Sequence, residues 1–391
     1  MRILVASHTY IVDLNREKLR ELARLEPNLE VMVVVPKRWK PGGVQKKLVE
    51  SQPINEGNFR VVPVSNFSKN QQGLLTFGLD LFGVLKEFKP DIIQVEQGAK
   101  SLGYAQFITY NRLLNLNAKN VFFTWWNLPY EVKFPLSVLE RYNLNHTDGV
   151  VVGNQDGAAI LRDHGYKGAM TVLPQLGVDE QLFCPQNVLD LREELGIPPQ
   201  EFVVGFVGRF VEEKGLMTLA KALQGLGDRP WRWLLLGRGP LREPLETWAK
   251  EQGLADKLTF VESVPHDQVS RYINLLDTLL LPSETTYRFK TLSSVGWKEQ
   301  FGHVLIEAMA CRVPVIGSDS GEIPHVIGES GLVFPEGDAD RLRDCLLKLM
   351  ENPELAGELA QRGYHRALAE YTNRAIAQKQ LGFYQELLAH R

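Results

Sequence analysis

Residues 202–216 read Phe-Val-Val-Gly-Phe-Val-Gly-Arg-Phe-Val-Glu-Glu-Lys-Gly-Leu, and this stretch decides the fold. The apolar run over 202–207 is typical of a buried parallel strand. It ends in Gly208 and Arg209, and Lys214 precedes a helical pattern. A strand, a glycine turn and a helix N-terminus can bind an anion, because glycine allows close backbone approach and the helix dipole favours negative charge. Arg209 can donate to two phosphate oxygens, and Lys214 adds a point charge. The stretch equally fits an ordinary strand-to-helix turn with surface cations.

Short β-rich runs alternate with amphipathic helical patterns on both sides of this stretch. Such alternation predicts parallel sheets with right-handed crossovers, and it occurs twice along the chain. The predicted strands are 3–6, 31–35, 92–95, 121–124 and 150–152 in the first half, and 202–207, 233–236, 258–261, 279–281 and 313–316 in the second. The predicted helices of the first half include 15–25, 79–88 and 136–144. The fold class is therefore α/β, with two doubly wound, Rossmann-like domains.

Prolines and glycines between residues 174 and 200 place the boundary between the two domains there. We predict an N-terminal domain over residues 1–175 and a C-terminal domain over 176–372. The segment 373–391 has a helical pattern with no strand after it, and we expect this helix to pack back on the N-terminal domain. A length of 391 residues suits two α/β domains better than one core.

Composition and charge restrict the class of protein. The chain is 44% hydrophobic and 23% charged, and no apolar stretch approaches the roughly 20 residues that span a bilayer. Its three cysteines are scattered and lack the spacing of a metal site, which favours a reducing, cytoplasmic location. Residues 1–175 carry a net charge of +5 and the remainder −8, so neither half has the charge of a nucleic-acid-binding protein.

One basic cluster surrounds an aromatic residue on a loop rich in glycine and proline. Lys37, Arg38, Trp39 and Lys40 precede Pro41-Gly42-Gly43, and Lys46 and Lys47 follow. An aromatic ring among cations can rest on an anionic membrane surface, so this loop is a candidate for peripheral membrane contact. A solvated loop after a strand is the alternative reading.

A second chemical element lies at 297–310, where two glutamates eight residues apart bracket a glycine. If a helix begins near Gly302, Glu299 lies in the loop that faces its N-terminus and Glu307 lies more than one turn inside. The backbone N–H groups of the first turn can bind a phosphate or a hydroxyl. Carboxylates accept hydrogen bonds from vicinal sugar hydroxyls. Alone, the pair also fits a solvated helix start.

Glu299 and Glu307, with Phe301 and Gly302 between them, resemble the Glu-x7-Glu motif of retaining glycosyltransferases of family 4, which have the GT-B fold of two Rossmann-like domains facing a central cleft. Other segments of the second half resemble this family in order and spacing. They are Gly208-Arg209 with 213–215, the glycine-proline turn 236–240, and the segments 277–283, 313–316, 320–324 and 331–333.

The resemblance implies roles for individual residues. Arg209 and Lys214 would hold the diphosphate of the donor, Glu299 would bind hydroxyls of the donor sugar, and Glu307 would bind the ribose. Further donor contacts would come from Gly208, Phe301, Gly302, Glu322 and His8. Enzymes of this family use no divalent metal, since cations and a helix terminus stabilise the leaving diphosphate. We therefore expect no cofactor beyond the nucleotide-diphosphate sugar itself.

The first half departs from the family in two places. Residues 7–10, Ser-His-Thr-Tyr, lack the glycine pair that family members often have after the first strand. Residues 124–127, Thr-Trp-Trp-Asn, replace a Thr-x-His-Asp segment, so the histidine is absent and Asn127 is the polar group left. Asn127 is thus the candidate on the acceptor side, and Tyr10 and Arg16 are further candidates for an acceptor or phosphate contact.

The sequence predicts a metal-independent enzyme that moves a hexose-type sugar from a nucleotide-diphosphate sugar to an acceptor with retention of configuration. The acceptor can be a glycan, a lipid or a small molecule, which places the enzyme in carbohydrate or glycolipid biosynthesis. Two alternatives stay open: a sugar-nucleotide epimerase or hydrolase of GT-B architecture, and a non-catalytic nucleotide-sugar-binding subunit. A nicotinamide dehydrogenase is disfavoured because neither half has a clean G-x-G-x-x-G.

Overall fold

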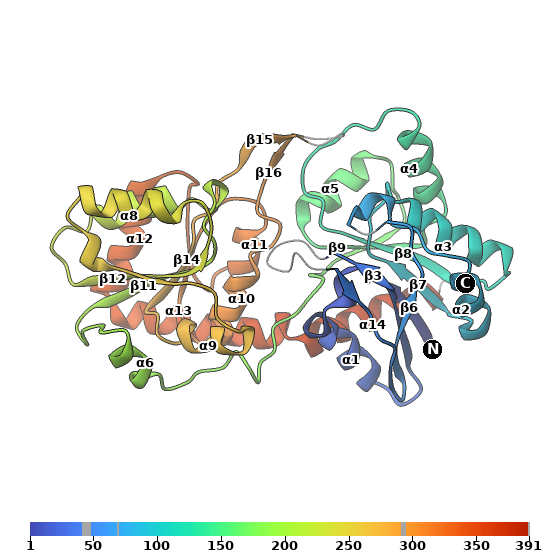
Figure 1. Cartoon of the computed structure of the whole chain (residues 1–391), viewed down its shortest axis with the longest axis horizontal. Coiled ribbons are helices and arrows are strands. Elements are labelled where there is room, and N and C mark those ends of the chain that lie inside the picture. The colour runs from blue at the N-terminus through green and yellow to red at the C-terminus, as the bar shows by residue number, and fades with distance from the viewer. Residues whose placement is uncertain (41–47, 69, 291–294, 390–391) are drawn as a thin grey trace. The chain divides into compact units, whose positions relative to one another are not determined.

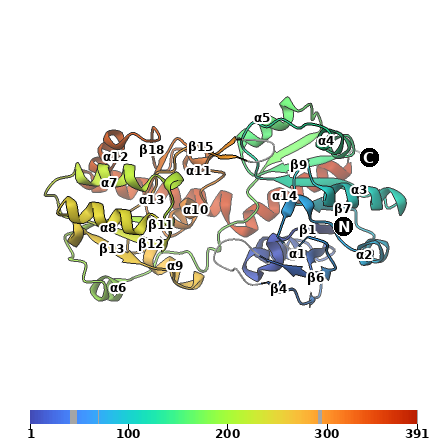
Figure 2. The same cartoon turned by 45° about the horizontal axis from the view of Figure 1, so that its top comes forward.

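The computed structural model describes residues 1–40, 48–68, 70–290 and 295–389, and it divides into two compact units (Figures 1 and 2). Unit 1 comprises Met1–Gly177 and Asn373–Arg391, and unit 2 comprises Val178–Thr372. Each unit contains its own sheet with helices on both faces. The chain leaves unit 1 after Gly177 and returns to it at Asn373, where the C-terminal helix begins.

Unit 1 is built on an eight-stranded sheet in the order β10-β9-β8-β7-β1-β2-β6-β5. All neighbours are parallel except β5, which pairs antiparallel with β6. The strands are β1 (Arg2–Ala6), β2 (Glu30–Pro36), β5 (Ile54–Glu56), β6 (Phe59–Val64), β7 (Ile92–Val95), β8 (Lys119–Thr124), β9 (Gly149–Val152) and β10 (Ala169–Val172). The sequence did not predict β5, β6 and β10, because Pro63 interrupts β6 and β10 is short and incompletely buried.

Alternating side chains of the sheet bury two apolar layers in unit 1. Ile3 and Val5 pack with α1 (Glu17–Arg24) and α14 (Asn373–Ala389) on one face. Leu4 and Ala6 pack on the other face with the helices α2 (Asp80–Phe88), α3 (Leu102–Leu113) and α5 (Gln155–Asp163). The C-terminal helix thus contributes Ile376, Ala377, Leu381 and Tyr384 to the core of unit 1.

Unit 2 contains a six-stranded parallel sheet in the order β13-β12-β11-β14-β17-β18. The strands are β11 (Phe202–Arg209), β12 (Trp231–Arg238), β13 (Leu258–Val261), β14 (Thr278–Leu281), β17 (Val315–Ser318) and β18 (Leu332–Phe334). The helices include α7 (Leu216–Gln224), α8 (Arg242–Glu251), α9 (His266–Ile273), α10 (His303–Ala310), α11 (Ile323–Ile327), α12 (Ala339–Glu351) and α13 (Pro353–Arg366). Strand β17 begins at Val315, later than predicted, because Pro314 has no N–H to donate to the ladder.

The order of strands marks one position in each sheet where a ligand is expected. In unit 2 the chain proceeds outward from β11 to β12 and β13, and then outward on the other side from β14 to β17 and β18. In unit 1 the same reversal lies between β1 and β7. Loops leave the two central strands in opposite directions there, and ligands of doubly wound sheets bind outside the carboxyl ends at this point.

The structure also tests what the composition predicted about membrane spans, the cysteines and the basic cluster around Trp39. In the described part of the chain, no helix combines the length and the apolar character needed to cross a membrane. Cys311 and Cys345 are buried and Cys184 is half-buried, and all three are free thiols. Trp39 is buried at 3% exposure within β3 (Arg38–Trp39), so its ring is not available for the membrane contact expected of it.

The neighbours of Trp39 in the basic cluster are exposed. Lys37, Arg38 and Lys40 all reach solvent, and Arg38 forms an ion pair with Glu50 across the pairing of β3 with β4 (Val49–Glu50), at 2.7 Å. Residues 41–47, with Lys46 and Lys47, lie outside the described residues. The burial of Trp39 has a local cause, because its indole packs into the apolar layer that contains Met32 and Val64.

Candidate functional site

The carboxyl ends of β11 and β14 carry the predicted donor-binding residues of unit 2. Strand β11 ends in Gly208 and Arg209, and Gly237 on the adjacent strand lies so close that a Cβ there would be 1.9 Å from the carbonyl oxygen of Gly208. The Arg209 side chain is 65% exposed, with its Nη2 3.6 Å from Oε1 of Glu213. A guanidinium held this loosely keeps most of its donors for a ligand.

The side chain of Glu299 is held by hydrogen bonds from two other side chains of the site. Its carboxylate is buried at 7% exposure and accepts hydrogen bonds from Lys214 Nζ at 2.5 Å and from Ser283 Oγ at 2.7 Å. The Lys214 ammonium also lies 5.1 Å from the ring centroid of Trp297. Glu299 and Lys214, which are 85 residues apart in the sequence, therefore form one buried ion pair at the switch point. The sequence predicted both residues for the site but not this pairing.

Gly215 allows the loop after β11 to reach the loop after β14. It has a φ of +64°, and a Cβ would lie 1.8 Å from the carbonyl oxygen of Pro282. The N–H of Glu284 donates to the carbonyl oxygen of Glu213 at 2.9 Å, which ties the same two loops together. Any side chain at position 215 would separate these loops and move Lys214 away from Glu299.

The helix α10 begins where the sequence predicts. Gly302 is its N-cap residue, with a φ of +85°, and a Cβ there would lie 2.6 Å from Cδ2 of Leu281. The Phe301 ring is buried, with its centroid 5.7 Å from that of Tyr371. Phe301 therefore serves as a packing residue through its side chain, and only its backbone is placed for the predicted ligand contact.

Glu307 differs from Glu299 in its surroundings. It lies within α10 and is half-buried, and its side chain forms no hydrogen bond or ion pair with any of the described residues. Burial without a cationic partner raises the pKa of its carboxyl group to about 7. The two glutamates of the motif thus have distinct environments: Glu299 is paired with a cation, whereas Glu307 has an open hydrogen-bonding capacity.

The loop after β17 completes the site around Glu299. Gly321 has a φ of +59°, and a Cβ there would lie 1.9 Å from the carbonyl oxygen of Glu299. The N–H of Glu322 donates to this same oxygen at 3.3 Å. Glu322 is buried and is the N-cap residue of α11. Loops from β11, β14 and β17 thus converge on Glu299, and they bring Lys214, Gly302 and Glu322 together with it.

In unit 1, His8 follows β1 at the corresponding switch point. Its ring lies 5.0 Å from that of Trp39, and its Nδ1 is buried with no hydrogen-bond partner among the described residues. Burial lowers the pKa of His8 to about 4, so the imidazole is neutral at neutral pH. His8 can therefore donate or accept a hydrogen bond, but it does not provide a positive charge for a phosphate.

Asn127 lies in the loop that follows β8, and its side chain is 4% exposed. The two preceding tryptophans are fixed by hydrogen bonds. Trp125 Nε1 donates to Gln175 Oε1 at 2.9 Å, and Trp126 Nε1 donates to the carbonyl oxygen of Leu128 at 2.6 Å. This segment is therefore an ordered part of the carboxyl edge of the sheet, on the acceptor side of the predicted enzyme.

Sequence reasoning missed a buried carboxylate at this edge. Glu96, just after β7, accepts hydrogen bonds from Tyr10 OH at 2.8 Å, Gln175 Nε2 at 2.6 Å and Gln94 Nε2 at 3.0 Å. Lys18 is also buried, and desolvation lowers its pKa to about 8 although Glu96 opposes the shift. Gln94 and Glu96 were the available signal, because polar residues at the end of an otherwise apolar buried strand need partners.

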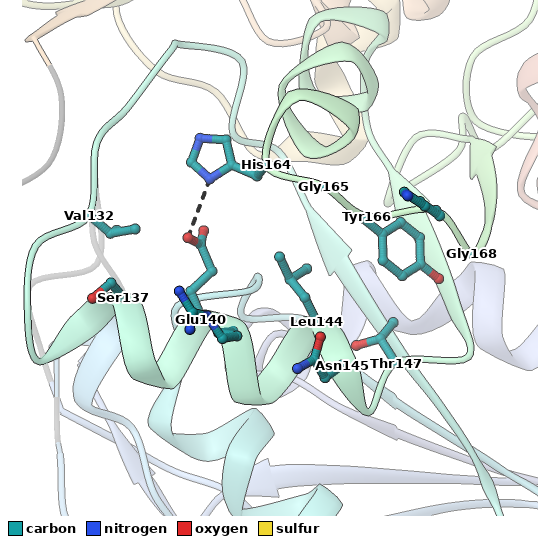
Figure 3. Close-up of a pocket in the computed structure, with 12 residues that line it drawn as sticks. Val132, Ser137, Glu140, Leu144, Asn145, Thr147, His164, Gly165, Tyr166 and Gly168 are labelled. Atoms are coloured by element: carbon teal, nitrogen blue, oxygen red, sulfur yellow. Dashed lines mark hydrogen bonds and ion pairs between the residues drawn. The ribbon is translucent and has the colours of Figure 1, made fainter.

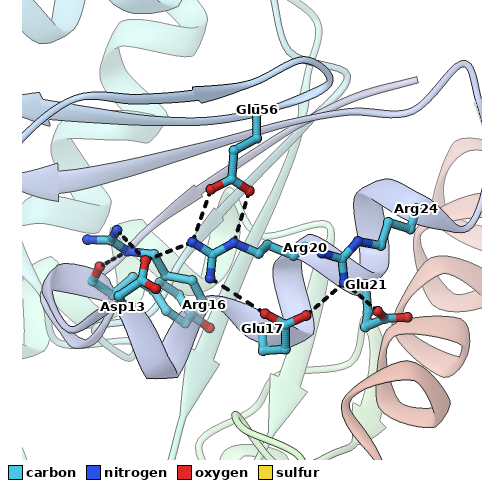
Figure 4. A network of polar contacts seen from close by, with 8 residues as sticks. Asp13, Arg16, Glu17, Arg20, Glu21, Arg24 and Glu56 are labelled. Carbon is cyan, nitrogen blue, oxygen red and sulfur yellow. Dashed lines mark hydrogen bonds and ion pairs between the residues drawn. The ribbon is translucent and has the colours of Figure 1, made fainter.

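Tyr10 and Arg16 were candidates for an acceptor or phosphate contact, and both are engaged in internal contacts. Tyr10 is fully buried against Glu96. The Arg16 guanidinium donates to the carbonyl oxygens of Tyr10 and Ile11. It also donates to Asp13 (Figure 4). Asp13 also binds Arg20 in the same network. Arg16 thus stabilises the turn after β1, and its buried guanidinium is bound to groups of the protein and not to a ligand.

Within residues 1–40, 48–68, 70–290 and 295–389, no group of three or more histidine, cysteine, aspartate or glutamate side chains is arranged to hold an ion.

Known proteins are similar to this chain in sequence and in fold. Residues 188–366 match the model of the family described as glycosyl transferases group 1. The 2-deoxystreptamine glucosyltransferase of Streptomyces kanamyceticus is 26% identical over 231 residues, which cover 57% of this chain and 56% of that protein. The GDP-mannose-dependent alpha-(1-6)-phosphatidylinositol monomannoside mannosyltransferase of Mycolicibacterium smegmatis is 30% identical over 210 residues, with coverages of 52% and 53%. The chain thus matches about half the length of these curated relatives.

Solved structures are similar over the whole chain. Sucrose-phosphate synthase from Thermosynechococcus elongatus has a TM-score of 0.69 at 22% identity and covers 100% of both chains. Anabaena Alr3699/HepE in complex with UDP has a TM-score of 0.70 at 15% identity, with coverages of 98% and 99%. At this identity the likeness shows the fold, and it confirms the predicted fold class. The chain therefore has the GT-B fold, and residues 188–366, which lie within unit 2, match the model of the glycosyl transferases group 1 family.

Proposed function

We propose that the protein is a glycosyltransferase that moves a hexose-type sugar from a nucleotide-diphosphate sugar to an acceptor, with retention of configuration and without a metal. The convergence of Lys214, Glu299 and the start of α10 at the switch point of unit 2 is the observation that carries this proposal. The similar proteins give it further support. Their names include a glucosyltransferase and a GDP-mannose-dependent mannosyltransferase, and Anabaena Alr3699/HepE has been solved with UDP and with UDP-glucose.

The donor diphosphate is assigned to Arg209 and Lys214. Arg209 is exposed and has unused donors, so it can bind two phosphate oxygens. Lys214 donates one of its three N–H groups to Glu299, and the other two are assigned to oxygens of the phosphates. Glu299 is assigned to hydroxyls of the donor sugar. Its fixed position orients the sugar relative to the phosphates, which is how an enzyme lowers the entropic part of a barrier.

In the proposed reaction, the bond between the anomeric carbon and the β-phosphate oxygen breaks while a bond to the acceptor hydroxyl oxygen forms on the same face. The acceptor proton passes to the departing phosphate oxygen. Arg209 and Lys214 stabilise the negative charge on the nucleotide diphosphate, which is the role a divalent cation has in other transferases. Asn127 is assigned to orient the acceptor, because an amide group has no basic site that could accept the proton at neutral pH.

The first prediction concerns donor binding. Arg209→Gln should weaken the binding of UDP-glucose about 10- to 100-fold, because hydrogen bonds to charged groups contribute about 1.5–3 kcal/mol. Titration calorimetry of the full chain measures this loss. Lys221→Gln, at an exposed position on α7, is the matched control and should bind as the unchanged protein does. Equal affinity in all three proteins would remove Arg209 from the site. A parallel titration with GDP-mannose identifies the preferred base.

The second prediction follows from the raised pKa of Glu307. A carboxylate accepts hydrogen bonds from ribose hydroxyls better than a carboxylic acid does, so nucleotide affinity should increase as the pH rises from 6 to 8. Glu307→Gln should lose this increase. The phosphates of the nucleotide also titrate in this range, but they affect both proteins equally. The ratio of the affinity of the unchanged protein to that of Glu307→Gln therefore reports on Glu307 alone. A ratio that stays constant over this pH range would contradict the assignment of Glu307 to the ribose.

The same pKa gives an opposite trend for the stability of the free protein. The folded-state pKa of Glu307 lies above its ordinary value of 4.5, so the native state binds the proton more tightly than the unfolded chain does. Its contribution to stability is full below pH 4.5 and is lost as the pH rises through about 7. Glu307→Gln should therefore gain stability relative to the unchanged protein between pH 5 and pH 8 in urea unfolding.

The third prediction concerns the product. With a UDP- or GDP-sugar and an acceptor identified by screening, proton NMR of the product should show the anomeric configuration of the donor. Addition of EDTA should leave the initial rate unchanged, because no step is assigned to a metal. Inversion of configuration, or loss of activity that Mg²⁺ restores, would refute the proposed mechanism. Release of free sugar without any acceptor product would instead identify a hydrolase.

The fourth prediction tests Asn127. Asn127→Ala should lower kcat about 10- to 100-fold, since loss of acceptor orientation raises the barrier of the chemical step. The affinity for UDP-glucose should not change, because Asn127 is not among the residues assigned to the donor. Asn70→Ala, an exposed position of the same unit, is the control and should retain full kcat. An unchanged kcat in Asn127→Ala would show that this side chain takes no part in transfer.

A further inference from the structure

Unit 1 contains a cavity that none of the predicted site residues lines. It has a volume of about 480 Å³ and lies between α4 (Leu136–Asn145) and the loop 164–168, which joins α5 to β10 (Figure 3). Thr147 and Gly168, at one end of the cavity, lie two residues before the first residue of β9 and one residue before that of β10, respectively. Ligands of doubly wound sheets bind at the opposite, carboxyl ends. The cavity is therefore separate from the switch point of unit 1.

The wall formed by residues 164–168 is held rigidly. Arg162 Nη1 donates to the carbonyl oxygens of Tyr166 at 2.9 Å and Gly168 at 3.0 Å. Tyr166 is fixed further, because its N–H donates to the carbonyl oxygen of Leu161 at 3.0 Å and its OH donates to that of Ala169 at 3.1 Å. A wall ordered by four hydrogen bonds loses little entropy when a ligand binds, so the cavity is preorganised.

The charges that line the cavity are unbalanced. Arg141 and Lys167 both line it, and neither forms an ion pair or a side-chain hydrogen bond with the residues that the structure describes. The one carboxylate in the lining, Glu140, is already bound by Tyr130 OH at 2.5 Å and by His164 Nδ1 at 3.3 Å. The lining therefore carries two cations against one carboxylate, and that carboxylate is held by Tyr130 and His164 and not by either cation. This arrangement favours an anionic ligand.

Neutral hydrogen-bonding groups lie in the same lining. The hydroxyl of Ser137 and the amide of Asn145, one at each end of α4, have no side-chain partners among the described residues. They can bind hydroxyl groups of a ligand whose anionic group contacts the two cations. The volume of the cavity falls in the range of sites for small molecules, about 300–1,000 Å³.

We propose that this cavity binds a small phosphorylated polyol, such as a hexose phosphate, with the phosphate at Arg141 and Lys167 and the hydroxyls at Ser137 and Asn145. A phosphate provides two charges and three acceptor oxygens, which matches two unpaired cations better than a single carboxylate does. The proposal does not depend on the transferase activity, because every residue that it uses lies in unit 1 and outside the candidate site.

Titration calorimetry of the full chain with glucose 6-phosphate tests the proposal, with glucose and inorganic phosphate as partial ligands. We expect glucose 6-phosphate to bind more tightly than either partial ligand. Arg141→Gln and Lys167→Gln should each weaken it about tenfold or more. Lys86→Gln, at an exposed position on α2 that does not line the cavity, is the control and should leave the affinity unchanged. Both cations are exposed, so these variants should fold, and circular dichroism verifies it.

Two further experiments distinguish binding in this cavity from binding of the same ligand elsewhere on the protein, and a free ligand from a lipid headgroup. Arg209→Gln should leave the binding of glucose 6-phosphate intact; loss in Arg209→Gln without loss in Arg141→Gln would place the ligand in unit 2 and overturn the proposal. Vesicles with and without phosphatidylinositol 4-phosphate show whether the phosphorylated polyol can be a lipid headgroup, through binding that again requires Arg141 and Lys167. No binding of any phosphorylated polyol, or equal binding by the doubly substituted variant, would also overturn it.

Discussion

The ion pair between Lys214 and Glu299 is the contact on which the candidate site of unit 2 depends. A buried carboxylate that lost its cation would carry a desolvation penalty of several kcal/mol, so the pair constrains both loops that contribute to it. Ser283 accompanies the pair from the end of β14, and Gly321 packs against the backbone of Glu299 from the end of β17. The glycines at 215, 302 and 321 follow from this requirement, since each allows a loop or helix start to approach closely at a positive φ.

The two glutamates of the motif show how one helix start can hold two carboxylates in different environments. Glu299 accepts hydrogen bonds from a lysine and a hydroxyl, and this geometry exists before any ligand arrives. Glu307 has no cation near enough to offset burial, so its pKa rises to about 7. A group in this state gains the most from ligand hydroxyls, because their hydrogen bonds compensate its desolvation. The positioning residue and the ligand-responsive residue are thus distinguished by environment and not by sequence.

Much of this arrangement could be predicted from the sequence, because the parallel strands are continuous apolar runs and Gly302 marks the start of the helix α10. What could not be predicted depends on long-range packing. The sequence indicates that Trp39 is an exposed aromatic residue on a loop. In the structure it pairs with Val49 in a short sheet, and its side chain packs in the core of unit 1. The sequence does not indicate that Lys214 is paired, because its partner Glu299 is 85 residues away along the chain. The buried Glu96 was indicated by its polar neighbours in β7, yet its partners Tyr10 and Gln175 come from distant loops.

The acceptor side of the proposed reaction is constrained by what the described residues of unit 1 can do with a proton. His8 has a pKa of about 4, so it is a weak base at neutral pH. Glu96 is buried and already accepts hydrogen bonds from Tyr10, Gln94 and Gln175, so its oxygens are engaged within the protein. Asn127 has no basic group. The oxygen of the departing phosphate is a stronger candidate than any of these, and it becomes more basic as its bond to the sugar breaks. Transfer on the same face of the sugar would therefore couple deprotonation of the acceptor to loss of the nucleotide, with unit 1 contributing orientation and not a base.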